Sequence, residues 1–145
     1  MTKPIDIAKA MLIEANNDYE VVPILIESGK YNLAVYHAQQ AVEKLQKACL
    51  AAEGKIGIFK HEIFSFFHNE FTNKINDETM GKLEDAVIPL EESWANSRYP
   101  DWSVEPIWIP SQQYTLDNAR MSETRMQSVF EILLPFLSEN YNIQV

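Results

Sequence analysis

Four polar side chains recur along one strongly helical segment of the 145-residue chain, at spacings of four, three and four residues: Tyr36, Gln40, Glu43 and Lys47. Since a helical turn takes about 3.6 residues, these spacings place all four on one face of a helix. Two interpretations stay open. The face is either exposed to solvent, where a Glu43–Lys47 ion pair stabilises the helix slightly, or it forms the polar wall of a ligand-binding cleft.

The chain has three histidines, His37, His61 and His68. His61 and His68 are two helical turns apart, roughly 10 Å along an axis, which is too far for both to bind one metal ion directly. The sequence has no H-E-x-x-H motif, no glycine-rich phosphate loop and no recognisable Ser-His-Asp arrangement. We therefore expect no metal and no cofactor. His61 either caps a helix or belongs to a polar site.

Residues 93–114, SWANSRYPDWSVEPIWIPSQQY, concentrate aromatic residues and prolines around a single arginine, Arg98. Tyr-Pro-Asp at 99–101 predicts a turn. An arginine before a rigid turn can hold its planar guanidinium in a fixed direction; alternatively, its charge only stabilises the end of the preceding helix. The tryptophans of this stretch either fold over the core or contact another chain.

Helical periodicity predicts five helices, over residues 4–28, 31–52, 60–71, from about 77 to the aromatic stretch, and 115–139. The second is the clearest, because alanines line the side opposite the polar face and allow a neighbouring helix to approach closely. Cys49 lies among them and is expected to be a small buried hydrophobe. The connections are short except for about residues 98–114. This pattern predicts an all-α, up-and-down bundle of about five helices, forming one domain over residues 1–145.

The composition restricts the partners and the compartment. The chain has 21 acidic and 12 basic residues and a net charge of −9, which argues against coating nucleic acid and makes DNA an unlikely ligand. A local basic site, or a basic protein partner, stays compatible with this charge. One cysteine allows no internal disulfide. No apolar run is long enough to span a membrane and the N-terminus does not read as a signal peptide, so we expect a cytoplasmic protein.

Three segments together resemble the HEPN domain family (higher eukaryote and prokaryote nucleotide-binding). The segment YNLAVYHAQQAVEKLQKACLAAEG resembles the signature helix of that family, KHEIFSFF resembles its next helix start at His61, and SRYPD resembles its A-R-Y-P segment at Arg98. The resemblance extends from about residue 5 to residue 140 in the right order. The signature-helix pattern is matched at Gly29, Tyr31, Ala34, Gln39 or Gln40, Ala41, Glu43, Lys47 and Ala48.

The resemblance implies an all-α bundle, often a homodimer, that commonly partners a minimal nucleotidyltransferase. Many members of the family are metal-independent RNases that act as toxins, and their signature is an arginine followed four to six residues later by a histidine. This sequence lacks that signature, because all three histidines precede the first arginine, Arg98. The resemblance therefore does not carry RNase activity over to this chain.

We expect the polar helix face and the residues around the turn to converge on one site. Glu43 would orient Arg98 or Lys47, and these two cations would receive a nucleotide phosphate or another acidic group. The expected ligand-binding residues are Tyr36, Gln40, Glu43, Lys47, His61, Arg98, Tyr99 and Asp101. The aromatic stretch would form a wall of the cleft, or a dimer interface through Trp102 and Trp108.

The leading hypothesis is a non-catalytic module that binds a nucleotide or RNA and partners a nucleotidyltransferase. One alternative is a metal-independent RNase toxin of a toxin–antitoxin pair, with a rearranged site in which His61 and Arg98 are catalytic. Another alternative is a purely structural dimerisation module.

Overall fold

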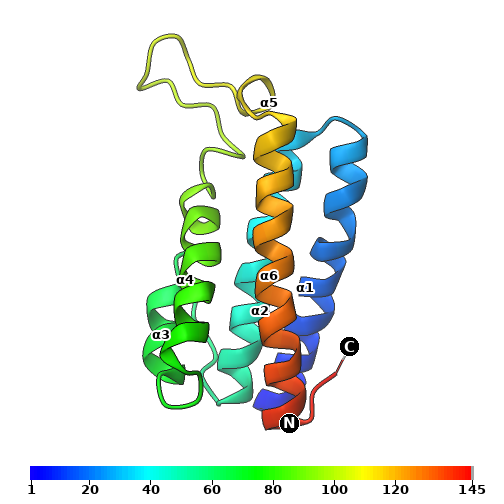
Figure 1. The fold of residues 1–145 in the computed structure, drawn as a ribbon, viewed down its shortest axis with the longest axis vertical. Coiled ribbons are helices and arrows are strands. Elements are labelled where there is room, and N and C mark those ends of the chain that lie inside the picture. Colours follow the sequence, from blue (N-terminus) through cyan, green and yellow to red (C-terminus); the bar gives the residue numbers. More distant parts are fainter. Residues whose placement is uncertain (145) are drawn as a thin grey trace.

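The computed structural model describes residues 1–144 as an up-and-down bundle of helices (Figure 1). The four longer helices alternate in direction, so that α1 begins and α6 ends at the same end of the bundle (Figure 1). No strand forms within these residues, and the predicted all-α bundle is confirmed. The helices are α1 (Pro4–Glu27), α2 (Tyr31–Ala52), α3 (Phe64–Phe71), α4 (Asp77–Glu92), α5 (Pro110–Gln113) and α6 (Leu116–Tyr141).

Some helix boundaries differ from the prediction. The third helix begins at Phe64 instead of residue 60, and its first backbone N–H donates to the carboxylate of Glu91 on α4 at 2.8 Å. The last helix continues through Pro135 to Tyr141. Pro135 is exposed, so the carbonyl that its ring leaves unpaired can reach water. The short α5 lies inside the long connection predicted over about residues 98–114.

Helix α2 packs against both α1 and α6. Its predicted apolar side is fully buried, since Ala38, Ala41, Leu45 and Ala48 are each 0% exposed. Small side chains on this side let the neighbouring helices approach closely, which leaves the opposite side of α2 free to carry the polar residues. Cys49 is also fully buried, as expected, and burial raises the pKa of its thiol, so it acts as a packing residue.

Between α4 and α5 the chain leaves the bundle and then returns to it (Figure 1). Residues 101–109, here called the arm, close on themselves through two backbone hydrogen bonds of 3.0 Å between Asp101 and Trp108. The indole N–H of Trp108 donates to the carbonyl of Asn96 at 2.8 Å, which ties the arm to the turn that follows α4. Trp102, by contrast, is 79% exposed.

A buried acid connects α1 to α2. Asp18 is 6% exposed, and its two carboxylate oxygens lie 2.9 Å from Nδ1 of His37 and 2.6 Å from Nζ of Lys44. Burial by itself would raise the pKa of Asp18, but the hydrogen bonds and charges of His37 and Lys44 outweigh it and hold the pKa below its ordinary value. The ionised form of Asp18 therefore stabilises the contact between the two helices.

We predict that Asp18→Asn lowers the free energy of unfolding by about 1–3 kcal/mol at pH 7, because Lys44 and His37 lose a charged acceptor. Asp18 has a depressed pKa in the folded state, so its stabilising effect is fully present above about pH 4 and is lost as the pH falls through the folded-state pKa. Urea unfolding at several pH values measures this difference. Glu14→Gln, which removes an exposed acid of α1, is the control, and equal stability of the two variants would contradict the prediction.

Candidate ligand-binding site

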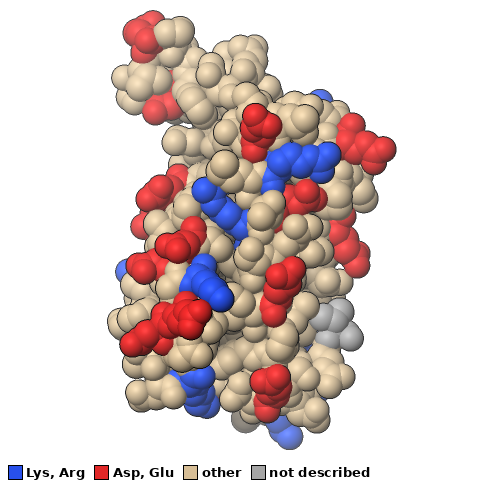
Figure 2. All heavy atoms as spheres, in the orientation of Figure 1, with Lys and Arg blue, Asp and Glu red and all other residues tan. Residues whose placement is uncertain are grey.

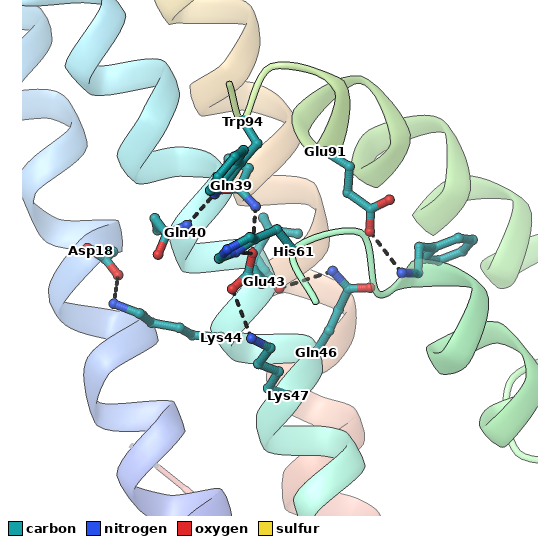
Figure 3. Close-up of polar contacts among 12 residues, drawn as sticks. Asp18, Gln39, Gln40, Glu43, Lys44, Gln46, Lys47, His61, Glu91 and Trp94 are labelled. Atoms are coloured by element: carbon teal, nitrogen blue, oxygen red, sulfur yellow. Dashed lines mark hydrogen bonds and ion pairs between the residues drawn. The ribbon is translucent and has the colours of Figure 1, made fainter. Parts of the chain in front are cut away.

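The carboxylate of Glu43 is the centre of the polar face of α2. Glu43 is 5% exposed, and three side chains contact it (Figure 3). Nε2 of Gln39 donates to Oε1 at 3.0 Å, Nδ1 of His61 lies 3.0 Å from the same oxygen, and Nζ of Lys47 donates to Oε2 at 3.0 Å. A buried carboxylate needs such compensation, because removing it from water without partners costs several kcal/mol.

The hydrogen bonds continue along α2 toward its N-terminal end. Gln40 donates to Oε1 of Gln39 at 2.7 Å, and Gln39 donates to Glu43 (Figure 3). Gln39 is 1% exposed and was not among the predicted ligand-binding residues. The signal that would have found it is the i, i+4 spacing of Gln39, Glu43 and Lys47, which places the three side chains in one row.

His61 lies in the segment between α2 and α3, and the contact with Glu43 fixes its ring. An ionised carboxylate can only accept a hydrogen bond, so Nδ1 of His61 carries the proton and Nε2 of the neutral ring is the acceptor. The ring stacks on the indole of Trp94, with centroids 4.2 Å apart and planes 21° apart. The side chain of His61 is still 44% exposed, so the oriented imidazole is accessible.

Arg98 is held by aromatic rings instead of by Glu43. Its guanidinium carbon lies 4.8 Å from the ring centroid of Tyr36, 4.6 Å from that of Trp94 and 4.8 Å from that of Tyr99. Nη2 also donates to the hydroxyl of Tyr99 at 2.6 Å. No carboxylate among residues 1–144 forms an ion pair with Arg98. Cation–π contacts use the faces of the guanidinium and leave N–H groups at its edge to donate to a ligand.

Trp94 joins the two halves of this arrangement, because its indole contacts both His61 and Arg98. Glu43, His61 and Arg98 thus belong to one chain of contacts, with Glu43 touching His61 directly and Trp94 lying between His61 and Arg98. Trp94 was not among the predicted ligand-binding residues. Glu43 was predicted to orient either Arg98 or Lys47. In the structure it contacts Lys47 and does not contact Arg98.

The other predicted residues lie farther along the chain. The carboxylate of Asp101 accepts from the backbone N–H of Ser103 at 2.9 Å and from its hydroxyl at 2.5 Å, and these bonds lower the pKa of Asp101. Asp101 therefore closes the turn of the arm. Trp108 is partly buried and meets Tyr114 edge-on at 5.8 Å, whereas Trp102 faces outward.

Glu91 and two unpaired polar atoms lie beside the site. Burial raises the pKa of Glu91, against the opposing effect of the hydrogen bond from Phe64, and the charges of Glu62 and Glu43 raise it further. Among residues 1–144, Oε1 of Gln46 and Nε1 of Trp94 are buried without a hydrogen-bond partner. Each such atom costs free energy. Residues that are not optimal for stability are thus concentrated around Glu43 and His61, as is common near functional sites.

No group of three His, Cys, Asp or Glu side chains among residues 1–144 is placed to hold a metal ion. None of the helices in that part of the chain is long and apolar enough to cross a membrane. A surface hollow of about 470 Å³ lies between α4 and α6, lined by Lys82, Arg125 and Glu131 among others, and it includes none of the predicted site residues.

The fold and the site define an all-α protein with a polar face on its second helix, completed by a histidine before the third helix and an arginine after the fourth. A family model described as HEPN domain matches residues 8–136. The chain therefore belongs to the HEPN family, and the resemblance seen in the sequence is confirmed.

Known proteins similar to this chain share its family or its fold. A protein of Methanocaldococcus jannaschii named "Putative toxin MJ1304" is 34% identical over 142 residues, covering 94% of this chain and 92% of that protein. The crystal structure of TT1696 from Thermus thermophilus matches with a TM-score of 0.70 and 21% identity, over 87% of this chain and 94% of that one. The crystal structure of ST0689, an archaeal HEPN homologue, matches with a TM-score of 0.70 and 20% identity, over 94% and 99% of the two chains. The two crystal structures support the fold alone.

We predict that Glu91→Gln raises the melting temperature by about 1–3 °C at pH 7, because the amide still accepts from Phe64 but carries no buried charge. The folded-state pKa of Glu91 is raised, so the penalty for ionising it is full above that pKa and vanishes below about pH 4, where the unfolded chain is protonated too. Thermal melts at pH 7 and at pH 3.5 test this. Glu92→Gln, at the adjacent exposed acid, should show no such pH-dependent gain; a gain of equal size there would contradict the prediction.

Proposed function

We propose that this HEPN-family protein is a non-catalytic module that binds the phosphate of a nucleotide or of RNA at Arg98, and that a nucleotidyltransferase is its protein partner. The proposal rests on the surroundings of Arg98. Three aromatic rings support its guanidinium, and no carboxylate among residues 1–144 forms an ion pair with it. A guanidinium with fixed faces and free edges suits a phosphate, because two N–H groups can donate to two phosphate oxygens at once.

The aromatic residues around Arg98 support the nucleotide part of the proposal. Tyr99 is 51% exposed, so a base can reach its ring. Stacking of a base on an aromatic side chain is favourable for every base, which suits a site without sequence preference. Lys47 is already paired with Glu43. Lys47 therefore contributes less to phosphate binding than was predicted from the sequence, and Arg98 is the main phosphate-binding residue.

The charge of the molecule favours a small or local contact. Figure 2 shows one face of the bundle, on which acidic and basic side chains are interspersed and no broad basic surface forms. With a net charge of −9, the long-range field repels polyanions. A phosphate is therefore bound through short-range contacts at Arg98, and we expect affinities in the micromolar range.

Calorimetric titration with AMP, ATP and a short RNA tests this function. We expect Arg98→Ala to weaken binding of each ligand at least about tenfold, because a charge-assisted hydrogen bond contributes about 1.5–3 kcal/mol. Arg98→Lys should recover only part of the loss, since lysine cannot donate as a planar fork. Arg120→Ala, at an exposed arginine of α6 paired with Glu123, is the matched control. Equal binding by the wild type and Arg98→Ala, or no binding at high micromolar concentration, would remove the proposed function.

A second candidate function, a metal-independent RNase toxin, is favoured by the hydrogen bond between Glu43 and His61. A buried carboxylate that fixes Nδ1–H of a histidine leaves Nε2 ready to take a proton, as in catalytic sites where an acid orients the base. In RNA cleavage, Nε2 of His61 would take the proton of a 2′-hydroxyl, and the 2′-oxygen would attack the adjacent phosphorus as the bond from phosphorus to the 5′-oxygen breaks. The leaving 5′-oxygen would take a proton from water, and Arg98 would stabilise the charge that develops on the phosphate. The name of the Methanocaldococcus jannaschii relative points in the same direction.

The RNase candidate predicts cleavage of total RNA by the purified protein in the presence of EDTA. His61→Ala should lower the rate at least about a hundredfold, and Glu43→Gln should lower it less, because the amide still contacts the ring but no longer stabilises its charge. His68→Ala, on the exposed side of α3, should leave the rate unchanged. RNA that stays intact with the wild-type protein rules out this candidate and leaves the binding function in place.

The arm is the segment that we propose for self-association. Trp102, in the arm, is 79% exposed, and large aromatic residues are common anchors of protein interfaces. Trp108 is held within its own chain by Asn96 and Tyr114. In the proposed homodimer Trp102 would therefore contribute more contact than Trp108.

A further inference from the structure

The segment that leads from α2 to His61 runs back along the polar side of α2. After the turn at Gly54, the backbone N–H of Lys55 donates to the carbonyl of Leu50 at 2.8 Å. Residues 55–58 then line a small hollow together with Lys47. Three residues farther on, His61 reaches Glu43. The segment thus passes Lys47 first and Glu43 next, and it forms an edge of the site.

Phe59 is the most exposed large apolar residue of this segment. Its side chain is 90% exposed, whereas Ile58 packs against the core and Ile63 is 0% exposed. Ile58 and Ile63 anchor the segment on either side of Phe59, and the ring of Phe59 has no partner among residues 1–144. Phe59 stands two residues before His61, so their Cα atoms are at most about 7 Å apart.

Two lysines lie near Phe59 in the sequence. Lys60 follows it directly and Lys55 precedes it by four residues. The ammonium group of Lys60 lies 5.2 Å from the ring centroid of Phe66 on α3, which keeps the charge close to the segment. A single exposed phenylalanine needs no functional explanation. Here the exposed ring has two lysines near it in sequence and lies on the edge of a site that holds an arginine without an acidic partner among residues 1–144. Basic groups together with exposed aromatic rings are what proteins use to bind single-stranded nucleic acid.

We propose that Phe59 is the stacking platform for a second base, so that the ligand of this site is single-stranded RNA of two or more nucleotides and not a mononucleotide. The proposal rests on the proposed binding function at Arg98. One phosphate contacts Arg98, the ring of Phe59 stacks on the base of the neighbouring nucleotide, and Lys60 lies beside the linking phosphodiester. A dinucleotide can contact Arg98 and Phe59 at the same time, whereas a mononucleotide contacts only one of them. The dinucleotide therefore binds more tightly.

The experiment compares AMP with the 5′-phosphorylated dinucleotide pApA by calorimetry at constant salt. The wild type should bind pApA about tenfold more tightly than AMP, since stacking of one base on an aromatic ring contributes about 1–3 kcal/mol. Phe59→Leu should bind pApA no more tightly than AMP and should bind AMP as the wild type does. Phe59→Trp should keep the preference, which separates stacking on an aromatic ring from simple apolar contact.

Ile13→Ala, at a residue of α1 that is 65% exposed, controls for loss of exposed apolar surface. Thermal melts should show that none of the variants changes the fold. A preference for pApA that survives in Phe59→Leu, or a wild type that binds AMP and pApA equally, overturns the inference while the proposed function stands. A wild type that binds neither ligand overturns both.

Discussion

The buried carboxylate of Glu43 is the constraint on which the site depends. A charge that is 5% exposed must be compensated, and the side chains that compensate it come from two different parts of the chain. Lys47 and Gln39 belong to α2 itself, whereas His61 belongs to the segment before α3. Holding His61 on Glu43 therefore also fixes the path of the segment that leads to α3.

A series of side-chain contacts leads from His61 back to α2. The imidazole stacks on Trp94, Trp94 contacts Arg98, and Arg98 lies over Tyr36. Tyr36 and Glu43 are seven residues apart on one helix, about two turns or roughly 10 Å. The contacts thus form a closed circuit that begins and ends on α2, so the imidazole and the guanidinium are held at a fixed separation. The HEPN RNase signature places an arginine before a histidine on one segment, whereas here the histidine precedes the arginine and an indole lies between them.

Much of the fold follows from local sequence. The 3.6-residue period of small residues predicted the buried side of α2, and the i, i+4 spacing of Glu43 and Lys47 predicted their contact. The remaining features of the fold and the site depend on contacts between residues that are far apart in the chain. Phe64 begins α3 where Glu91, 27 residues later, accepts its N–H. Arg98 is directed by the rings of Tyr36 and Trp94, and no pattern in the sequence shows that these rings would replace Glu43 as its support.

The central claim is that the carboxylate of Glu43 sets the orientation and the tautomer of His61. Long-range nitrogen–proton NMR correlation of the neutral His61 ring in the wild-type protein measures the tautomer directly. The account predicts that the neutral ring carries its proton on Nδ1, facing Glu43, and that Glu43→Leu loses this preference. A neutral His61 protonated on Nε2 in the wild type, or a tautomer that is the same in Glu43→Leu, would contradict it.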